Sequence, residues 1–179
     1  MRKKISTPSE MEIALLGSLE EFSCICELGT KVTNGVATRG WYTKRGLEYT
    51  SIDWNGLDGA LPLDLQKPID LGPFDILTNF GTTEHVENQE ACWRNVHNLT
   101  KKVSVHLTPI GPHWEKHEGI YWLTPMEFYS EFAELNGYEV EALRVSQWRS
   151  GSNRLITEAR LRKVKNLPFS MPSVKMEKV

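Results

Sequence analysis

Four short apolar runs recur along the chain between residues 23 and 107, and each ends near a glycine, a proline or an asparagine–glycine pair. They span residues 23–28, 47–53, 74–80 and 103–107. Apolar runs of this length, bounded by turn-forming residues, are typical of buried β-strands. The pattern therefore predicts four short strands in the interior of a sheet.

Helical signals lie between and around these strands. Residues 7–10 (Thr-Pro-Ser-Glu) combine a hydroxyl N-cap, proline at the first helical position and glutamate three residues after the cap, and residues 124–127 (Thr-Pro-Met-Glu) repeat the combination. Within residues 87–99 the apolar positions recur with helical spacing. Gly137 predicts the end of the last helix. We expect helices at these three places.

Two longer alternating runs, residues 138–148 and 153–164, follow the last helix, and a Ser-Gly-Ser stretch joins them. This arrangement predicts an antiparallel hairpin. From Asn166 onward the sequence has no period, which indicates an extended or mobile end. We therefore expect one domain over residues 1–165 and a tail over residues 166–179, and we expect removal of the chain after Leu167 to be tolerated.

Strands that alternate with helices imply right-handed βαβ units. The expected fold class is α/β: an open, mostly parallel sheet with helices on both faces and a C-terminal antiparallel hairpin. In such sheets, ligands bind beyond the carboxyl ends of the strands, where the strand order reverses. The residues that directly follow each strand are therefore the candidates for a functional site.

Composition narrows the function classes further. The chain has 179 residues, 21 Lys and Arg against 23 Asp and Glu, and a formal net charge of −2. This balance argues against non-specific nucleic-acid binding, which needs clustered positive charge. No apolar run approaches the roughly 20 residues of a membrane span. Polar residues follow the basic start, and the three cysteines form no framework, so we expect a cytoplasmic protein.

The order of the strand-end residues resembles that of class I S-adenosylmethionine-dependent methyltransferases. The resemblance rests on Glu27-Leu28-Gly29 after the first strand, Asp53 at the end of the second, and residues 74–77 leading to Glu84-His85-Val86. It extends from about residue 23 to residue 164. It implies a Rossmann-like fold, the cofactor S-adenosylmethionine and a methyl-transfer reaction. One departure is that residues 30–35 contain a single later glycine, in place of the family's closely spaced glycines.

The residue types suit this cofactor. A carboxylate ending the second strand can accept hydrogen bonds from both ribose hydroxyls, and glycine allows close approach of the backbone. A carboxylate after the first strand can accept from the ligand's ammonium, and an indole can cover the adenine. Residues after the third strand would lie beside the methionine part. The expected cofactor-binding residues are Glu27, Gly29, Thr30, Asp53, Trp54, Asp64, Leu65, Asn79, Phe80 and Gly81.

Several of these residues have a simpler interpretation. Asp53, which precedes Trp54-Asn55-Gly56, is also suited to an Asx turn. Trp54, Leu65 and Phe80 are also suited to ordinary packing. Glu27 is harder to explain without function, because a carboxylate at the end of a buried strand needs a partner.

Residues 109–123 form a long aromatic stretch flanked by glycines, which predicts a lid over the site. Within it we expect His117 to act as the general base, with His113 in reserve, because histidine titrates near neutral pH. The two histidines are four residues apart, a spacing that can hold zinc on a helix. The surrounding glycines and proline indicate a loop and supply no third ligand, so we predict no metal site.

The sequence therefore predicts a small S-adenosylmethionine-dependent methyltransferase that acts on a small-molecule or unidentified acceptor. The alternative is a catalytically inactive binding or regulatory protein on the same scaffold. A nicotinamide-dependent enzyme fits less well, because the three-glycine fingerprint is missing at the first turn.

Overall fold

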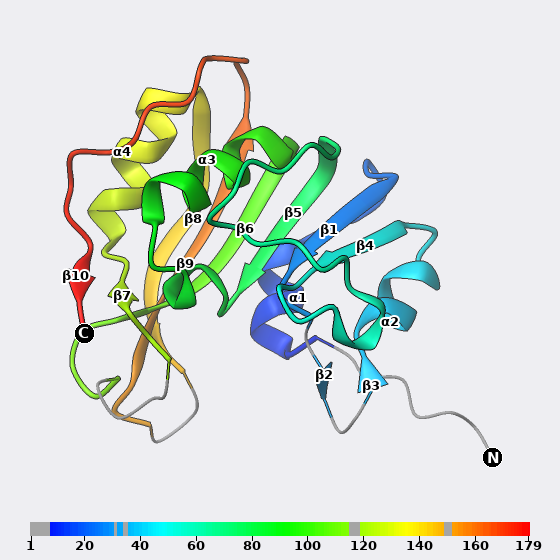
Figure 1. Cartoon of the computed structure of the whole chain (residues 1–179), viewed down its shortest axis with the longest axis horizontal. Coiled ribbons are helices and arrows are strands. Elements are labelled where there is room, and N and C mark those ends of the chain that lie inside the picture. Colours follow the sequence, from blue (N-terminus) through cyan, green and yellow to red (C-terminus); the bar gives the residue numbers. More distant parts are fainter. Residues whose placement is uncertain (1–7, 31, 34–35, 115–118, 149–151) are drawn as a thin grey trace.

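The computed structural model describes residues 8–30, 32–33, 36–114, 119–148 and 152–179. The main strands are β1 (Cys24–Leu28), β4 (Glu48–Ile52), β5 (Phe74–Phe80), β6 (Thr100–Ile110), β8 (Tyr138–Gln147) and β9 (Leu155–Lys163). They form one open sheet in the order β4-β1-β5-β6-β9-β8, shown in Figure 1. Strands β4, β1, β5 and β6 run parallel, whereas β9 is antiparallel to β6 and to β8. The predicted α/β fold with its C-terminal hairpin is confirmed.

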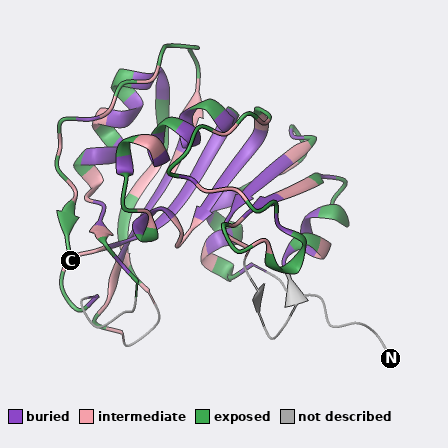
Figure 2. Cartoon of the chain, viewed as in Figure 1, coloured by how far each residue is buried: buried purple, intermediate pink, exposed green. Residues whose placement is uncertain are grey.

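Helices cover both faces of this sheet. They are α1 (Glu10–Leu16), α2 (Arg39–Thr43), α3 (Gln89–Leu99) and α4 (Met126–Asn136), with short 3₁₀ turns η1 (Leu57–Gly59) and η2 (Thr83–His85). Residues that alternate along the strands belong to two separate apolar clusters: Ile76 packs with α1 and α2, and Leu77 packs with α3 and α4. Figure 2 shows the central strands buried between these layers. Among the described residues, no helix has the length and apolarity to span a membrane.

The helices begin one or two residues later than the sequence patterns predict. The Ser9 side chain accepts a hydrogen bond from the Glu12 N–H, and the Glu12 carboxylate accepts one from the Ser9 N–H at 2.7 Å. The capping box of α1 is therefore Ser9 with Glu12, two residues beyond the predicted one. The predicted stop of the last helix is confirmed, because Gly137 ends α4 with φ of 75°.

The capping box predicted at residues 124–127 is wrong. Pro125 is the N-cap of α4, and no side chain of the described residues caps this helix. Thr124 contacts other parts of the fold instead, because its carbonyl oxygen accepts from the Thr157 hydroxyl of β9 and its own hydroxyl donates to the Met176 sulfur. The Thr124 hydroxyl, which the local pattern predicts to cap α4, therefore makes a tertiary contact instead.

The C-terminal segment runs extended along α4 (Figure 1). Four of its apolar side chains pack against the core cluster that contains α3 and α4: Phe169, Met171, Val174 and Met176. Its last strand, β10 (Glu177–Lys178), pairs with β7 (Trp122–Leu123), and the Val179 N–H donates to the Tyr121 carbonyl oxygen at 3.0 Å. Two further short strands, β2 (Val32–Thr33) and β3 (Val36–Ala37), pair with each other.

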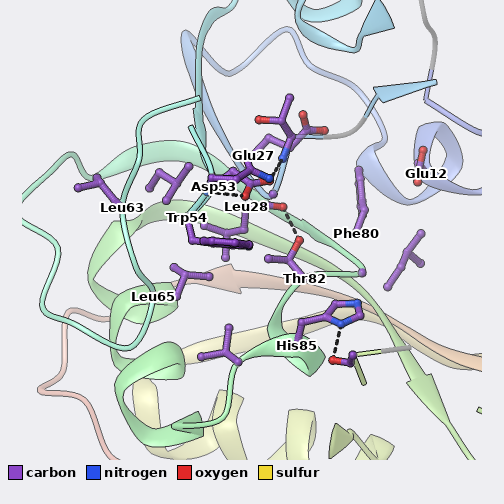
Figure 3. Close-up of a pocket in the computed structure, with 18 of the residues that line it drawn as sticks. Glu12, Glu27, Leu28, Asp53, Trp54, Leu63, Leu65, Phe80, Thr82 and His85 are labelled. Atoms are coloured by element: carbon purple, nitrogen blue, oxygen red, sulfur yellow. Dashed lines mark hydrogen bonds between the residues drawn. The ribbon is translucent and has the colours of Figure 1, made fainter. Parts of the chain in front are cut away.

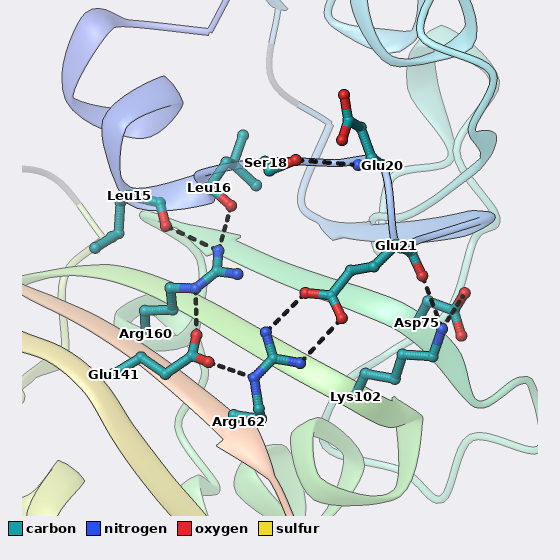
Figure 4. A network of polar contacts seen from close by, with 10 residues as sticks. All are labelled: Leu15, Leu16, Ser18, Glu20, Glu21, Asp75, Lys102, Glu141, Arg160 and Arg162. Atoms are coloured by element: carbon teal, nitrogen blue, oxygen red, sulfur yellow. Dashed lines mark hydrogen bonds and ion pairs between the residues drawn. The ribbon is translucent and has the colours of Figure 1, made fainter.

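A group of charged side chains joins the first helix to the hairpin (Figure 4). The Arg160 guanidinium on β9 donates to the carbonyl oxygens of Leu15, at 3.1 Å, and Leu16, at the end of α1. Glu141 on β8 pairs with both Arg160 and Arg162. A cation at the C-terminal end of a helix is electrostatically favourable. The contacts fix α1 relative to a hairpin that is more than 140 residues away in the sequence.

The strand order reverses between β1 and β5. The chain leaves β1 toward β4 on one side and then returns to form β5 on the other side. Connections that leave in opposite directions open a crevice at the carboxyl ends of the strands. The fold therefore presents a site beyond β1, β4 and β5.

Candidate active site

A pocket of about 1190 Å³ opens at this crevice, as Figure 3 shows. Its wall contains nine of the ten residues that the sequence predicts for the cofactor: Glu27, Gly29, Thr30, Asp53, Trp54, Asp64, Leu65, Phe80 and Gly81. The sheet thus brings together residues that are more than 50 positions apart in the chain.

Asp53 combines the two interpretations that the sequence leaves open. One carboxylate oxygen accepts from the Asn55 N–H at 3.3 Å, which is an Asx turn. The other accepts from the Thr30 N–H at 3.1 Å, so the carboxylate also fixes the loop after β1. The same side chain lines the pocket. Its turn-forming role therefore does not remove it from the site.

Glu27 has the partners that its burial requires. The side chain is 1% exposed, and the Thr38 hydroxyl donates to it at 2.8 Å and the Tyr49 hydroxyl at 2.5 Å. Burial, with the nearby Glu27 charge, raises the pKa of Tyr49 above its ordinary range. Both hydroxyls therefore keep their protons and stabilise the carboxylate at the pocket wall.

The aromatic and apolar residues of the site divide into two kinds. Leu65 is buried in the core cluster, and Phe80 packs against the other cluster, so the packing interpretation holds for both. Trp54 differs, because 80% of its side chain is exposed although it lines the pocket. Figure 3 shows its ring between Asp53 and Leu65. Packing within the described chain does not explain an indole in this position.

Gly29 is required by its backbone conformation and by a close neighbour. Its φ is 72°, and a Cβ at this position would lie 2.4 Å from the Thr82 Oγ1. The Thr82 hydroxyl donates to the Leu28 carbonyl oxygen at 2.7 Å. Thr82, which bridges the loops after β1 and β5, therefore makes a close approach that demands glycine at this position.

Asn79 is the one predicted cofactor residue outside the pocket wall. It is fully buried, and its side-chain oxygen accepts from the N–H groups of Thr82, at 3.2 Å, and Thr83, at 3.1 Å. Its amide nitrogen donates to the Thr83 hydroxyl. Asn79 shapes the turn that carries Thr82, because it satisfies backbone donors that would otherwise be buried and unpaired.

The predicted catalytic histidines are not found in the described pocket wall. His113 is exposed, and its carbonyl oxygen accepts from the Arg154 guanidinium. His117 lies outside the described residues. Of the predicted lid, Gly119 and Tyr121 do line the pocket, and so does His85 of η2.

Several pocket residues were not predicted from the sequence. They include Glu12 and Met11 of α1, Thr82 and His85 after β5, and Trp148 after β8. The signal for Thr82 and His85 was available, because both follow a predicted strand end. The Thr82 side chain does not cap η2, since its hydroxyl donates to the Leu28 carbonyl oxygen. Glu12, Met11 and Trp148 carry no local signal, since only the packing of α1 and the hairpin brings them to the pocket.

Glu84 belongs to η2, next to the pocket residue His85, but does not itself line the pocket. It is 4% exposed, and burial raises the pKa of its carboxyl to about 8. One carboxyl oxygen has no hydrogen-bond partner among the described residues. Its backbone carbonyl accepts from the Tyr121 N–H at 2.9 Å, which joins η2 to the segment before β7. At neutral pH the side chain is therefore mostly a neutral acid.

The fold is that of class I S-adenosylmethionine-dependent methyltransferases. The chain superposes on 1,6-didemethyltoxoflavin-N1-methyltransferase from Burkholderia thailandensis, which was solved with 1,6-didemethyltoxoflavin and S-adenosylhomocysteine bound. The TM-score is 0.61 at 9% identity, over 80% of this chain and 72% of that chain. The N-methyltransferase NodS from Bradyrhizobium japonicum WM9, in complex with S-adenosylhomocysteine, also matches with a TM-score of 0.61 at 14% identity, over 85% of each chain.

A further match is magnesium protoporphyrin IX methyltransferase from Synechocystis PCC 6803, with S-adenosylmethionine bound, at a TM-score of 0.54 and 12% identity over 78% of this chain and 69% of that one. No family model and no curated protein sequence matches the chain. The likeness is therefore one of fold.

Proposed function

We propose that this protein binds S-adenosylmethionine in the pocket beyond β1, β4 and β5 and transfers its methyl group to a small molecule. The observation that carries the proposal is the joint position of Asp53, Trp54 and Glu27 around one pocket at the strand-order reversal. The fold neighbours described above were solved with S-adenosylmethionine or S-adenosylhomocysteine bound, which supports the choice of ligand.

The side chains present fit the chemistry of this cofactor. Asp53 would accept from the ribose hydroxyls, and Glu27 would accept from the ammonium group, directly or through water. Trp54 would cover the adenine with an indole face that no other part of the described chain uses for packing. Carboxylates also favour a cationic sulfonium through their negative potential.

The size of the pocket leaves room for a second molecule. Ligand sites are commonly about 300–1,000 Å³. The pocket here, at about 1190 Å³, exceeds this range, and its part lined by α1 and Tyr121 lies beyond the residues assigned to the cofactor. We assign that part to the methyl acceptor.

In this proposal, S-adenosylmethionine supplies an electrophilic methyl group. The chain orients the two ligands: Asp53 and Trp54 fix the nucleoside, and Gly81 and Phe80 bound the space beside the methionine part. Positioning of two reactants can account for much of the rate acceleration in a simple displacement.

Calorimetric titration with S-adenosylhomocysteine tests the proposal. We expect saturable binding, and we expect Asp53→Ala to weaken it by about 1.5–3 kcal/mol, the scale of hydrogen bonds to a charged group. Asp70→Ala removes an exposed carboxylate that does not line the pocket and serves as the matched control. Unchanged affinity in a folded Asp53→Ala protein would remove Asp53 from the site.

The same titration separates the other function classes. Binding of the cofactor with no transfer to any acceptor would favour a catalytically inactive binding protein. If the wild type binds neither form of the cofactor at millimolar concentration, the protein shares only the fold of methyltransferases and not their cofactor binding. Saturable binding of NADH in its place would favour the nicotinamide-dependent class.

A further inference from the structure

His85 lies in the wall of the pocket, at the point where the loop after β5 meets the segment before β7. It belongs to η2, and its neighbours Thr82 and Val86 line the same pocket. Figure 3 shows the imidazole and Phe80 on the side of the pocket away from Leu63 and Leu65. If Trp54, next to Leu65, covers the adenine as proposed above, His85 lies toward the other end of the cofactor.

The hydrogen bond of His85 determines which nitrogen is basic. Its Nδ1 lies 2.6 Å from the Gly119 carbonyl oxygen. A carbonyl oxygen can only accept, so Nδ1 must carry the proton and donate. In the neutral ring, the basic nitrogen is then Nε2. A histidine that accepts a proton on one ring nitrogen is commonly held in place by a hydrogen-bond acceptor at the other nitrogen.

The surroundings of His85 indicate the kind of molecule that would meet it. The described wall in this part of the pocket is largely apolar and aromatic, with Met11, Phe80, Leu107, Tyr121 and Trp148. The acidic groups in the described wall are the carboxylates of Glu10, Glu12, Glu27, Asp53 and Asp64. These carboxylates give the pocket a negative electrostatic potential, which disfavours phosphate and carboxylate ligands. The apolar and aromatic wall favours a ligand that is itself partly aromatic.

We propose that His85 Nε2 is the proton acceptor of this site and that the methyl acceptor is a small, uncharged, partly aromatic molecule that donates an O–H or N–H to it. The inference rests on the proposed methyl transfer. In that step the bond between carbon and the sulfonium sulfur breaks, a bond from the same carbon to oxygen or nitrogen forms, and the sulfur leaves as a neutral thioether. The proton of the O–H or N–H passes to His85 Nε2 and from there to solvent.

The test uses phenol and anisole as probes, because they share a ring and differ in the proton that the proposal requires. Both are titrated into ¹⁵N-labelled protein saturated with S-adenosylhomocysteine, and the histidine nitrogens are followed by long-range ¹H–¹⁵N spectra. We expect a protonated Nδ1 on His85, a shift of Nε2 on addition of phenol, and binding of phenol about fivefold tighter than that of anisole, the value of one neutral hydrogen bond. Benzoate, with the same ring and a negative charge, should bind more weakly than phenol.

Two variants make the assignment specific. His85→Asn places an amide nitrogen near the position of Nδ1, so it can still donate to Gly119, but it has no atom at Nε2. His113→Asn is the control, because His113 does not line the pocket and its φ of 79° is one that asparagine tolerates. We expect His85→Asn to abolish the preference for phenol and to leave the affinity for S-adenosylhomocysteine within twofold, and His113→Asn to change neither.

Each outcome separates the inference from the proposed function. Absence of binding of S-adenosylhomocysteine to the wild type overturns the proposed function. Binding of that ligand with equal affinities for phenol and anisole, or with no shift of Nε2 up to the solubility limit of phenol, overturns the role of His85 alone. A preference that survives in His85→Asn does the same, and tight binding of benzoate overturns the proposed charge class of the acceptor.

Discussion

The two walls of the pocket are built in different ways. The strand-end wall, which we define as Gly29, Thr30, Asp53, Trp54 and Gly81, follows directly from β1, β4 and β5. The remote wall, which we define as Met11, Glu12, Gly119, Tyr121 and Trp148, comes from α1, the segment before β7 and the end of β8.

The difference lies in what holds each wall. The strand-end wall is held by short contacts between neighbouring strand ends, such as the bond from the Thr30 N–H to Asp53. The remote wall depends on partners far along the chain: Arg160 holds the end of α1, and Val179 bonds to Tyr121. His85 connects the two, because it follows β5 and bonds to Gly119. Variants should therefore be able to damage one wall and spare the other.

The largest effect is expected from removal of the chain after Leu167. The truncation removes four apolar side chains that pack against the core, together with β10 and its pairing with β7. We expect the free energy of unfolding to fall by about 3 kcal/mol or more, the value of several partly buried apolar side chains. This reverses the tolerance that the sequence predicts.

Chemical denaturation measures the loss, and titration with S-adenosylhomocysteine under conditions that keep the truncated chain folded measures the strand-end wall. Removal of residues 177–179 alone is the matched control, because it deletes β10 and spares the packed side chains. Equal denaturation midpoints for the Leu167 truncation and the full chain would show that the tail contributes nothing.

An effect of similar size is expected from Glu84→Gln. Burial raises the pKa of this carboxyl from 4.5 to about 8, so between these values the folded chain holds a proton that the unfolded chain has lost. The folded state binds more protons, and stability therefore falls as the pH rises from about 5 to about 8.

Glutamine cannot ionise, so the variant should lose this dependence, a difference on the order of 4 kcal/mol across the window of about three pH units. Urea denaturation of both proteins at several pH values measures it as a difference of slopes. Parallel stability curves for the two proteins would place the titration of Glu84 outside this range.

Gly29→Ala changes a residue of the strand-end wall. The new Cβ would lie 2.4 Å from the Thr82 Oγ1 at a φ of 72°, so we expect a loss of about 2 kcal/mol in stability and weaker binding of S-adenosylhomocysteine. Thr82→Ala removes the atom that clashes. In a double-mutant cycle the second substitution should recover part of the loss, whereas strictly additive effects would show that the close approach is unimportant.

The smallest effect is expected from Arg160→Ala, which releases the end of α1. Its hydrogen bonds to the Leu15 and Leu16 carbonyls join charged to neutral groups, so we expect a loss of about 1–2 kcal/mol in stability. Affinity for S-adenosylhomocysteine should stay within about threefold, since the strand-end wall is untouched. Arg162→Ala removes a guanidinium that pairs with the carboxylates of Glu21 and Glu141 and does not contact the helix end, so it should cost less. An equal cost would mean that the ion pairs, and not the helix end, matter.

The fold could be predicted from the sequence because its signals are local. The run at residues 74–80 coincides with β5, and those at 23–28 and 47–53 contain β1 and β4. Apolar runs of strand length that alternate with helices leave few topologies, and those topologies place ligands at the strand ends. For this reason Asp53, Trp54 and Glu27 could be selected from their positions in the chain alone, and they lie in one pocket.

The sequence by itself therefore determined the sheet, the hairpin and the strand-end wall. Tertiary structure decided the rest. Whether Thr124 caps a helix depended on a competing contact of its hydroxyl with Met176, and the tail became part of the core because its apolar side chains reach the cluster that contains α3 and α4. Met11 and Trp148 reach the pocket only through the packing of α1 and the hairpin, and His85 has a fixed tautomer through a carbonyl oxygen 34 residues away. Long-range contacts of this kind leave no periodicity, because the bonding partner of a side chain is set by packing and not by its neighbours in the chain.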